Sequence, residues 1–220
     1  MLVADLLTDE IPPLKQTDTV KMALDWMEQF KVSHLAVVNE RELLGLVSEH
    51  ELIDDNNPDE LLMNFKGKLL RPIIHINQHT YDLLKIMMSF NLTLMPVLDD
   101  KEQYKGCISL KGLLQNISTM ASVQNVGGVI VLEVNQVDYS LTQIASIVEG
   151  NDAKILSAHI SSLPDSNKVE VTLKINREDL SRILQTFYRY NYIVKASFQH
   201  SDFESGLRDK LDEFMHFLNI

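Results

Sequence analysis

The fold is decided by the stretch TDTVKMALDWMEQFKVSHLAVVNERELLGLVSEHELI, residues 17–53, which recurs in altered form as QHTYDLLKIMMSFNLTLMPVLDDKEQYKGCISLKGLL, residues 78–114. Aligned without a gap, the two copies share five like positions: Thr19 with Thr80, Met27 with Met88, Gly45 with Gly106, Ser48 with Ser109, and Leu52 with Leu113. Identity is sparse, but the apolar residues keep the same periodicity in both copies. Repeats of this kind bury their apolar faces against each other. The sequence therefore predicts two similar units around one shared core.

Each copy is predicted to fold in the order helix, strand, strand, helix. Asp18 or Thr19 can cap the first helix, because a short polar side chain accepts the amide hydrogens that a helix start leaves unpaired. Helical spacing predicts an apolar face made of Val20, Ala23, Leu24 and Met27 in the first copy and of Tyr81, Leu84 and Met88 in the second. Strands are expected at 35–38 and 45–48, and again at 94–98 and 106–109, with the second helices beginning near Glu49 and Leu110.

The second half of the chain has a different pattern. Small polar residues at 118–127 indicate a linker. Beyond them, apolar runs and amphipathic stretches predict the order strand, helix, strand, strand, helix, strand over residues 129–198. This order is typical of a ferredoxin-like βαββαβ sandwich.

The predicted fold class is therefore α/β (α+β), with four parts along the chain. We expect one repeat at 1–60, a second at 61–120, a ferredoxin-like domain at 126–200 and an amphipathic helix at 201–220. The last helix would carry Leu207, Leu211, Phe214 and Leu218 on one face. We expect it to dock on its own domain or on a second subunit.

Composition narrows the classes of partner. The 220 residues are 45% hydrophobic and 23% charged, and 31 acidic against 20 basic side chains give a net charge of −11. An acidic surface repels nucleic acid and anionic lipid, so we expect neither as a partner. Residues 112–132 lack charged side chains but are too polar to cross a membrane. The N-terminus lacks the features of a signal peptide, and the expected location is cytoplasmic.

The sequence does not indicate an enzyme. Cys107 is the only cysteine, which excludes an intrachain disulfide and a cysteine-based zinc site. A Gly-x-Gly-x-x-Gly loop, a P-loop and a nucleophile elbow are all absent from the sequence. We expect neither a catalytic residue nor a metal site, and an inert core thiol at Cys107.

The repeated unit resembles the CBS domain, and the tandem resembles a CBS pair, or Bateman module. The resemblance covers residues 1–117 and rests on the strand pairs together with the flanking segments ADLLTDEIPPLKQTDTV and GKLLRPIIHINQHTYDL. It implies a regulatory module whose clefts bind adenosine-containing ligands such as AMP, ADP, ATP or S-adenosylmethionine.

The resemblance also implies which residues would line such clefts. In the family, a Ser or Thr after the second strand supports the sugar or phosphate, and an Asp three residues later accepts hydrogen bonds from the ribose hydroxyls. The first copy has Ser48 and, in place of Asp, the longer Glu51, whereas the second has Ser109 without a carboxylate. Three further residues complete the candidate ligand-binding set: Lys111, which would favour phosphate, and Met95 and Pro96, which match the segment lining the adenine side. The alternative is that the clefts are packed shut and that both serines cap helices.

Residues 131–160 resemble the opening of an ACT domain, a small-ligand sensor built on the βαββαβ topology. Asp138 and Leu141 match the family's turn, but Ser140 stands where the family has glycine and would crowd a ligand carboxylate. An amino-acid site and a ligand-free dimerising role both remain open for this domain.

Two functions of different classes follow. The order and length of the parts resemble the acetoin-utilisation protein B family, which implies a non-enzymatic sensor that forms a homodimer and responds to an adenine nucleotide. The alternative is a ligand-free assembly module that acts through contacts with a protein target.

Overall fold

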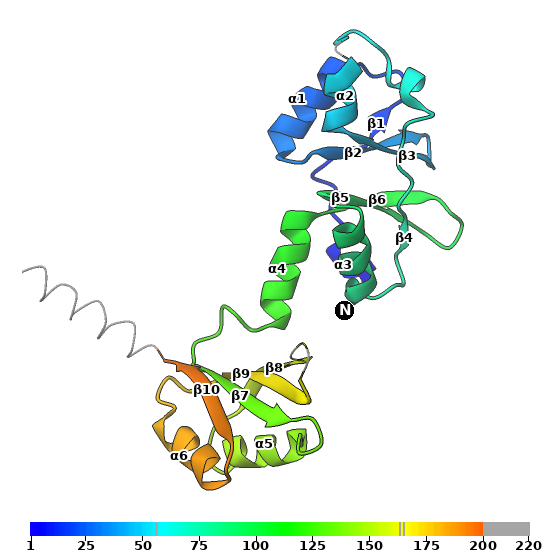
Figure 1. The fold of residues 1–220 in the computed structure, drawn as a ribbon. Helices are drawn as coiled ribbons and strands as arrows, with labels where there is room; N and C mark the ends of the chain where they lie inside the picture. The colour runs from blue at the N-terminus through cyan, green and yellow to red at the C-terminus, as the bar shows by residue number, and fades with distance from the viewer. Residues whose placement is uncertain (56, 163, 165, 200–220) are drawn as a thin grey trace, which may run out of the picture. The chain divides into compact units, whose positions relative to one another are not determined.

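The computed structural model describes residues 1–55, 57–162, 164 and 166–199, and its chain divides into two compact units, Met1–Asn116 and Ile117–Ile220. The C-terminal helix predicted at 201–220 lies outside the described residues. Both units mix helices with sheets, as the sequence predicts (Figure 1).

The first repeat is a three-stranded sheet with two helices. Its elements are β1 (Leu14–Lys15), α1 (Val20–Phe30), β2 (His34–Asn39), β3 (Glu42–Ser48) and α2 (Glu49–Asp55), and its sheet order is β1-β2-β3. Strand β1 is parallel to β2, whereas β2 and β3 form an antiparallel hairpin. Thr19 caps α1, since its hydroxyl accepts a hydrogen bond from the Met22 amide at 3.3 Å. The helix ends at Lys31 in the left-handed conformation.

The second repeat has the same plan. Its elements are β4 (Ile74–His75), α3 (Thr80–Ser89), β5 (Leu94–Leu98), β6 (Tyr104–Ser109) and α4 (Leu110–Met120), and its sheet order is β4-β5-β6. Strand β2 lies against β5, so the two sheets meet through their middle strands (Figure 1). The predicted pair of similar units around a shared core is confirmed.

The segment before each repeat crosses to the other one. The 3-10 helix η1 (Val3–Leu6) contacts the second repeat, where the Val3 amide donates to the Gln78 carbonyl at 2.9 Å. The 3-10 helix η2 (Leu62–Phe65) contacts the first repeat, where the Leu62 amide donates to the Asp18 carbonyl, also at 2.9 Å. The two repeats are therefore joined by a reciprocal exchange of their leading segments.

Glycine makes one of these crossings fit. Gly45 has φ +149° and lies where Leu46 pairs with Leu70 of the crossing segment. A Cβ added at Gly45 would lie 2.7 Å from both the Leu69 Cβ and the Leu70 carbonyl oxygen. A side chain at this position would therefore collide with the backbone of Leu70, and the backbone of the substituted residue would be strained.

The buried face of α3 corrects the gap-free alignment of the repeats. This helix buries Thr80, Leu83 and Met87, whereas α1 buries Val20, Ala23 and Met27. Tyr81 and Met88 are 62% and 69% exposed, and Leu84 is only half-buried. The predicted face of Tyr81, Leu84 and Met88 is therefore wrong by one residue.

The one-residue difference between the repeats lies in a hairpin turn. Val37 pairs with Gly45 in the first repeat and Val97 pairs with Gly106 in the second, so the second hairpin has one more residue between its strands. The alignment requires a gap at that turn, because strand pairing sets the register on both sides of it.

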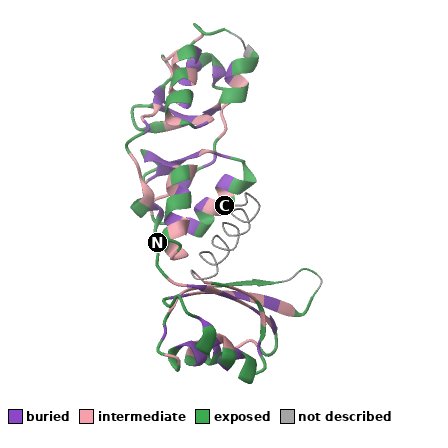
Figure 2. Cartoon of the chain, turned by 90° about the vertical axis from the view of Figure 1, so that its left-hand side faces the viewer, coloured by how far each residue is buried: buried purple, intermediate pink, exposed green. Residues whose placement is uncertain are grey.

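Strands supply most of the core in this unit, and helices expose their outer faces (Figure 2). The side chain of Cys107 is buried, and burial raises its pKa to about 11. The expectation of an inert core thiol is consistent with this environment, since the thiolate is the reactive form.

The second unit is the predicted ferredoxin-like sandwich. Its elements are β7 (Val129–Asn135), α5 (Leu141–Glu149), β8 (Ile155–Ser162), β9 (Lys168–Ile175), α6 (Ser181–Arg189) and β10 (Ile193–Phe198). The strands form one antiparallel sheet in the order β10-β7-β9-β8, and both helices cover the same face (Figure 1). The linker predicted at 118–127 is shorter than expected, because α4 continues to Met120.

Alternation along the strands positions the core of this unit. In β9, four apolar side chains point towards the helices and are buried: Val169, Val171, Leu173 and Ile175. Phe187 of α6 is fully buried and meets the Tyr192 ring edge-on, with 5.4 Å between centroids. Polar side chains face the other way, where Lys168 pairs with Glu133 at 2.5 Å.

None of the helices in the described part of the chain is both long and apolar enough to cross a membrane.

Candidate functional site

A polar cluster lies where the middle strands of the two repeats meet. The Ser33 amide donates to the Thr93 hydroxyl at 2.9 Å, and the Ser33 and Thr93 hydroxyls are 3.3 Å apart. The Nδ1 atom of His34 is 3.2 Å from the Thr93 hydroxyl and accepts from the Thr93 amide at 3.5 Å. We call Ser33, His34 and Thr93 the seam, because they connect one repeat to the other by hydrogen bonds.

The seam also holds the start of one helix in each repeat. The Glu49 amide, at the start of α2, donates to the Ser33 carbonyl at 2.9 Å, and the Leu110 amide, at the start of α4, donates to the Thr93 carbonyl at 2.9 Å. These two helix starts follow directly after Ser48 and Ser109. The predicted ligand-binding serines of both copies therefore adjoin the seam.

Ser48 and Glu51 contact each other at the start of α2. The Glu51 carboxylate accepts hydrogen bonds from the Ser48 hydroxyl at 2.9 Å and from the Ser48 amide at 3.3 Å. The Glu51 amide in turn donates to the Ser48 hydroxyl at 3.3 Å. This reciprocal arrangement is a capping box, so in the ligand-free chain the two side chains stabilise the start of α2.

The second copy is equipped differently. The Ser109 hydroxyl accepts from the Gly112 amide at 3.1 Å, which is the geometry of a helix cap. Lys111 is exposed, and both Met95 and Pro96 are buried in β5, where Pro96 faces Cys107 of β6. The position equivalent to Glu51 is Gly112 in this copy, which has no carboxylate.

The electrostatics of the seam centre on His34. Its ring is partly buried, and this burial holds the pKa of His34 below its ordinary value. Glu51 and Glu49 act in the opposite direction, because a nearby carboxylate favours the protonated ring. The candidate ribose ligand Glu51 and the seam histidine therefore influence each other.

Sequence reasoning missed Ser33, His34 and Thr93. Ser33 and Thr93 each lie just before the first strand of their hairpin, so they are equivalent once the one-residue gap is introduced. The gap-free alignment paired Ser33 with Leu94 and hid this relation.

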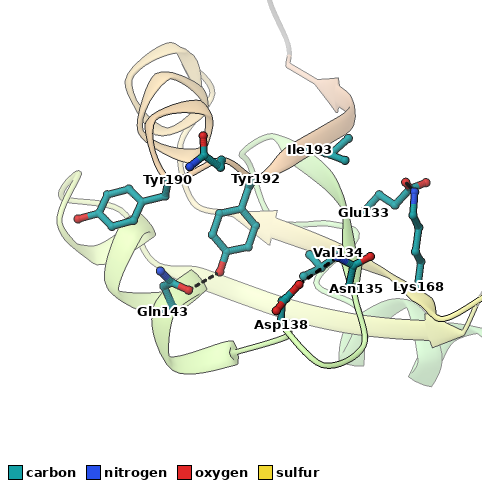
Figure 3. Close-up of a pocket in the computed structure, with 10 residues that line it drawn as sticks. Glu133, Val134, Asn135, Asp138, Gln143, Lys168, Tyr190, Tyr192 and Ile193 are labelled. Atoms are coloured by element: carbon teal, nitrogen blue, oxygen red, sulfur yellow. Dashed lines mark hydrogen bonds and ion pairs between the residues drawn. The ribbon is translucent and has the colours of Figure 1, made fainter.

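A cavity lies in the ferredoxin-like unit (Figure 3). It has a volume of about 270 Å³ and is lined by Glu133, Val134, Asn135, Asp138, Gln143, Lys168, Tyr190, Asn191, Tyr192 and Ile193. The Tyr192 hydroxyl points at Gln143 and donates to its side-chain oxygen at 3.0 Å. The Asn135 amide group donates to the Asp138 carboxylate at 2.9 Å. A small polar ligand could bind here by exchanging these internal hydrogen bonds.

Ser140, at the family's glycine position, caps α5. Its hydroxyl accepts from the Gln143 amide at 3.3 Å, so one helix amide that a ligand carboxylate would need is already occupied. Among the described residues, no group of three or more His, Cys, Asp or Glu side chains could hold a metal ion.

Residues 3–55 match the family model described as the CBS domain. This segment is a CBS domain. It contains β1, α1, β2, β3 and α2, and therefore Ser48, Glu51 and the first half of the seam. The second repeat has the same element order and sheet order, so the first unit has the fold of a CBS pair.

One curated relative is an uncharacterized protein of Methanocaldococcus jannaschii, which is 26% identical over 118 residues. The match covers 53% of this chain and 39% of that protein, so the chain spans well under half the length of its relative.

Similar solved structures are CBS proteins. A CBS domain pair/ACT domain protein from Thermotoga maritima is 22% identical, with 54% of this chain and 98% of that chain covered and a TM-score of 0.48. A putative acetoin utilization protein from Vibrio cholerae is 19% identical, with 56% and 95% covered and a TM-score of 0.48. A third CBS domain pair, 18% identical with 54% and 97% covered and a TM-score of 0.43, was solved with 5′-methylthioadenosine and S-adenosylmethionine.

Proposed function

We propose that this chain is a non-enzymatic regulatory protein whose CBS pair binds an adenosine-containing ligand through the first repeat. The observation that carries the proposal is the pairing of Ser48 with Glu51 at the start of α2, inside the segment that matches the CBS family. AMP, ADP, ATP and S-adenosylmethionine share the ribose that this pair would bind.

The chemistry of the pair fits ribose. A carboxylate accepts two hydrogen bonds at once, and each bond from a hydroxyl to a charged acceptor contributes about 1.5–3 kcal/mol. The ligand would replace Ser48 as the donor to Glu51, so ribose binding exchanges one set of hydrogen bonds for another. The second copy has Gly112 in place of the carboxylate, and we therefore propose one ribose site per chain.

We expect Glu51→Gln to weaken binding of the best adenosine ligand at least tenfold, because the amide loses the negative charge and one acceptor. The measurement is a thermal-shift screen of the full chain with AMP, ADP, ATP, S-adenosylmethionine and the amino acids, followed by isothermal titration of the best compound. Glu49→Gln is the matched control, since Glu49 is an exposed carboxylate two residues away on the same helix. Absence of stabilisation by every adenosine compound at millimolar concentration would contradict the proposal.

The ferredoxin-like unit would supply the second input. Its resemblance to an ACT domain and its cavity of about 270 Å³ support small-ligand sensing or dimerisation there. A thermal shift with an amino acid that survives Glu51→Gln would assign that ligand to this unit.

The second candidate function is assembly through protein contacts, with a homodimer as the simplest form. It is favoured by two apolar side chains that the second repeat leaves exposed on one face of α3, which we call the α3 stripe: Tyr81 at 62% and Met88 at 69%. The equivalent positions of α1 include Lys21 and Glu28, which are charged. Exposed apolar side chains grouped on one element are typical of an interaction surface.

If the α3 stripe joins two copies, Met88→Glu should lower the dimer fraction and raise the dimer dissociation constant at least tenfold, because it places a charge in an apolar contact. The measurement is light scattering after size-exclusion chromatography over a range of concentrations. Val137→Glu is the control, since Val137 is 92% exposed in the second unit. A dimer that Met88→Glu leaves intact would exclude the stripe as its interface.

A further inference from the structure

The seam joins the two repeats through a histidine that must act as an acceptor. The Thr93 backbone amide donates to Nδ1 of His34, and a backbone amide has no lone pair with which to accept. The Nδ1 atom therefore carries a lone pair, and in the neutral ring the proton is on Nε2.

Protonation of His34 is incompatible with this arrangement. Both ring nitrogens of an imidazolium are donors, so a proton on Nδ1 would face the amide hydrogen of Thr93. The Thr93 and Ser33 hydroxyls, which lie 3.2 and 3.3 Å from Nδ1, could turn to accept from the charged ring, but the Thr93 amide would be left without its acceptor. The charged ring must break at least one of the hydrogen bonds that cross between the repeats.

We propose that the seam is a proton-sensitive latch between the two repeats, closed when His34 is neutral and opened when His34 is protonated. The latch would act on both clefts at once, because Ser33 and Thr93 hold the starts of α2 and α4 through their carbonyl groups. It rests on the proposed function only in that these helix starts adjoin the candidate ligand site.

The groups around His34 determine whether its pKa is raised or lowered. The charged groups that act on it within the described residues are Glu51 and Glu49, both on α2, while β3 presents Ser48 and the turn before β5 presents Thr93. Burial outweighs the two carboxylates, so the pKa of His34 is below its ordinary value of 6.5.

This direction fixes the pH window. Between 6.5 and the lower folded-state pKa, the unfolded chain binds more protons at this position than the folded chain, so stability falls as the pH falls. Above 6.5 the ring is neutral in both states and the latch contributes fully. The unfolding equilibrium constant of the first unit should therefore rise by up to about tenfold for each pH unit between 6.5 and the folded-state pKa, and should not change further below that pKa.

The test uses the full chain without ligand, so its failure is separable from failure of the proposed nucleotide site. In two-dimensional NMR spectra from pH 8 to pH 5, the Thr93 amide signal should titrate with the same midpoint as the His34 ring, below 6.5. In His34→Gln the Thr93 signal should no longer titrate. His159→Gln, which removes an exposed histidine of the second unit, should leave the titration unchanged.

Two further variants separate the latch from simple packing. Thr93→Val keeps the shape of the side chain and removes the nearer hydroxyl that could accept from the charged ring, so it should strengthen the pH dependence of unfolding, and Thr93→Ser should return it to that of the unmodified chain. The proposal is overturned if the Thr93 amide does not follow His34, or if His34→Gln unfolds with the same pH dependence as the unmodified chain.

Discussion

Gly45→Ala should destabilise the first unit by about 2–6 kcal/mol, because two costs add at that position. The residue has φ +149°, a conformation that costs an L-residue about 1–3 kcal/mol. The new methyl group would also lie 2.7 Å from the Leu70 carbonyl oxygen, and forcing extra volume into a packed site costs about 1–3 kcal/mol. Urea unfolding followed by the fluorescence of Trp26, the only tryptophan, reports on this unit.

Gly67→Ala is the matched control. A Cβ at Gly67 meets no atom within 4 Å. This glycine lies three residues before Leu70, in the segment that crosses to the first repeat. Its replacement should change the free energy of unfolding by less than about 1 kcal/mol. Equal losses in the two variants would show that the close crossing at Gly45 does not limit stability.

Phe187→Ala should destabilise the second unit by about 3–5 kcal/mol, because it removes a fully buried ring and leaves a cavity. Tyr192 also loses its edge-on contact with the Phe187 ring. The Tyr192 hydroxyl donates a hydrogen bond to Gln143 in the wall of the cavity shown in Figure 3. Amide hydrogen exchange in β7 and β9 measures the loss directly.

The neighbouring residue supplies the control for this variant. Tyr188 is on the same helix and is 57% exposed, so Tyr188→Ala should change amide exchange in the sheet little. Similar increases in exchange for the two variants would contradict the prediction that burial of the Phe187 ring stabilises the second unit.

The elements could be predicted from sequence wherever one physical signal dominated. The spacing of Val20, Ala23 and Met27 predicted α1, the polar Thr19 predicted its start, and the alternation from Val169 to Ile175 predicted β9. Each of these signals is local, so a single sequence contains it in full.

The α3 face could not be predicted in the same way. Residues 80–88 contain two apolar faces, one with Leu83 and Met87 and one with Leu84 and Met88, and helical periodicity alone does not choose between them. The gap-free comparison with α1 pointed to the wrong face, because the turn after β5 is one residue longer than the turn after β2 and displaces that comparison by one position. Strand pairing is a tertiary effect, which the sequence pattern of a single helix does not contain.

The candidate site was predictable in part for a related reason. Ser48 and Glu51 are three residues apart on one helix start, so sequence spacing alone brings them together. His34 and Thr93 are far apart in the chain and meet only when the two sheets pack. Their roles depend on that packing, and nothing in the local sequence of either residue indicates it.

The reciprocal exchange of leading segments has a consequence during synthesis. Thr8 pairs with Cys107, so the earlier of these residues leaves the ribosome well before its partner exists. At about 5–20 residues per second the wait is on the order of ten seconds. Until residues 76–78 have been made, the backbone of η1 lacks its hydrogen-bond partners in the second repeat. The N-terminal segment can therefore reach its native position only after most of the second repeat has been made.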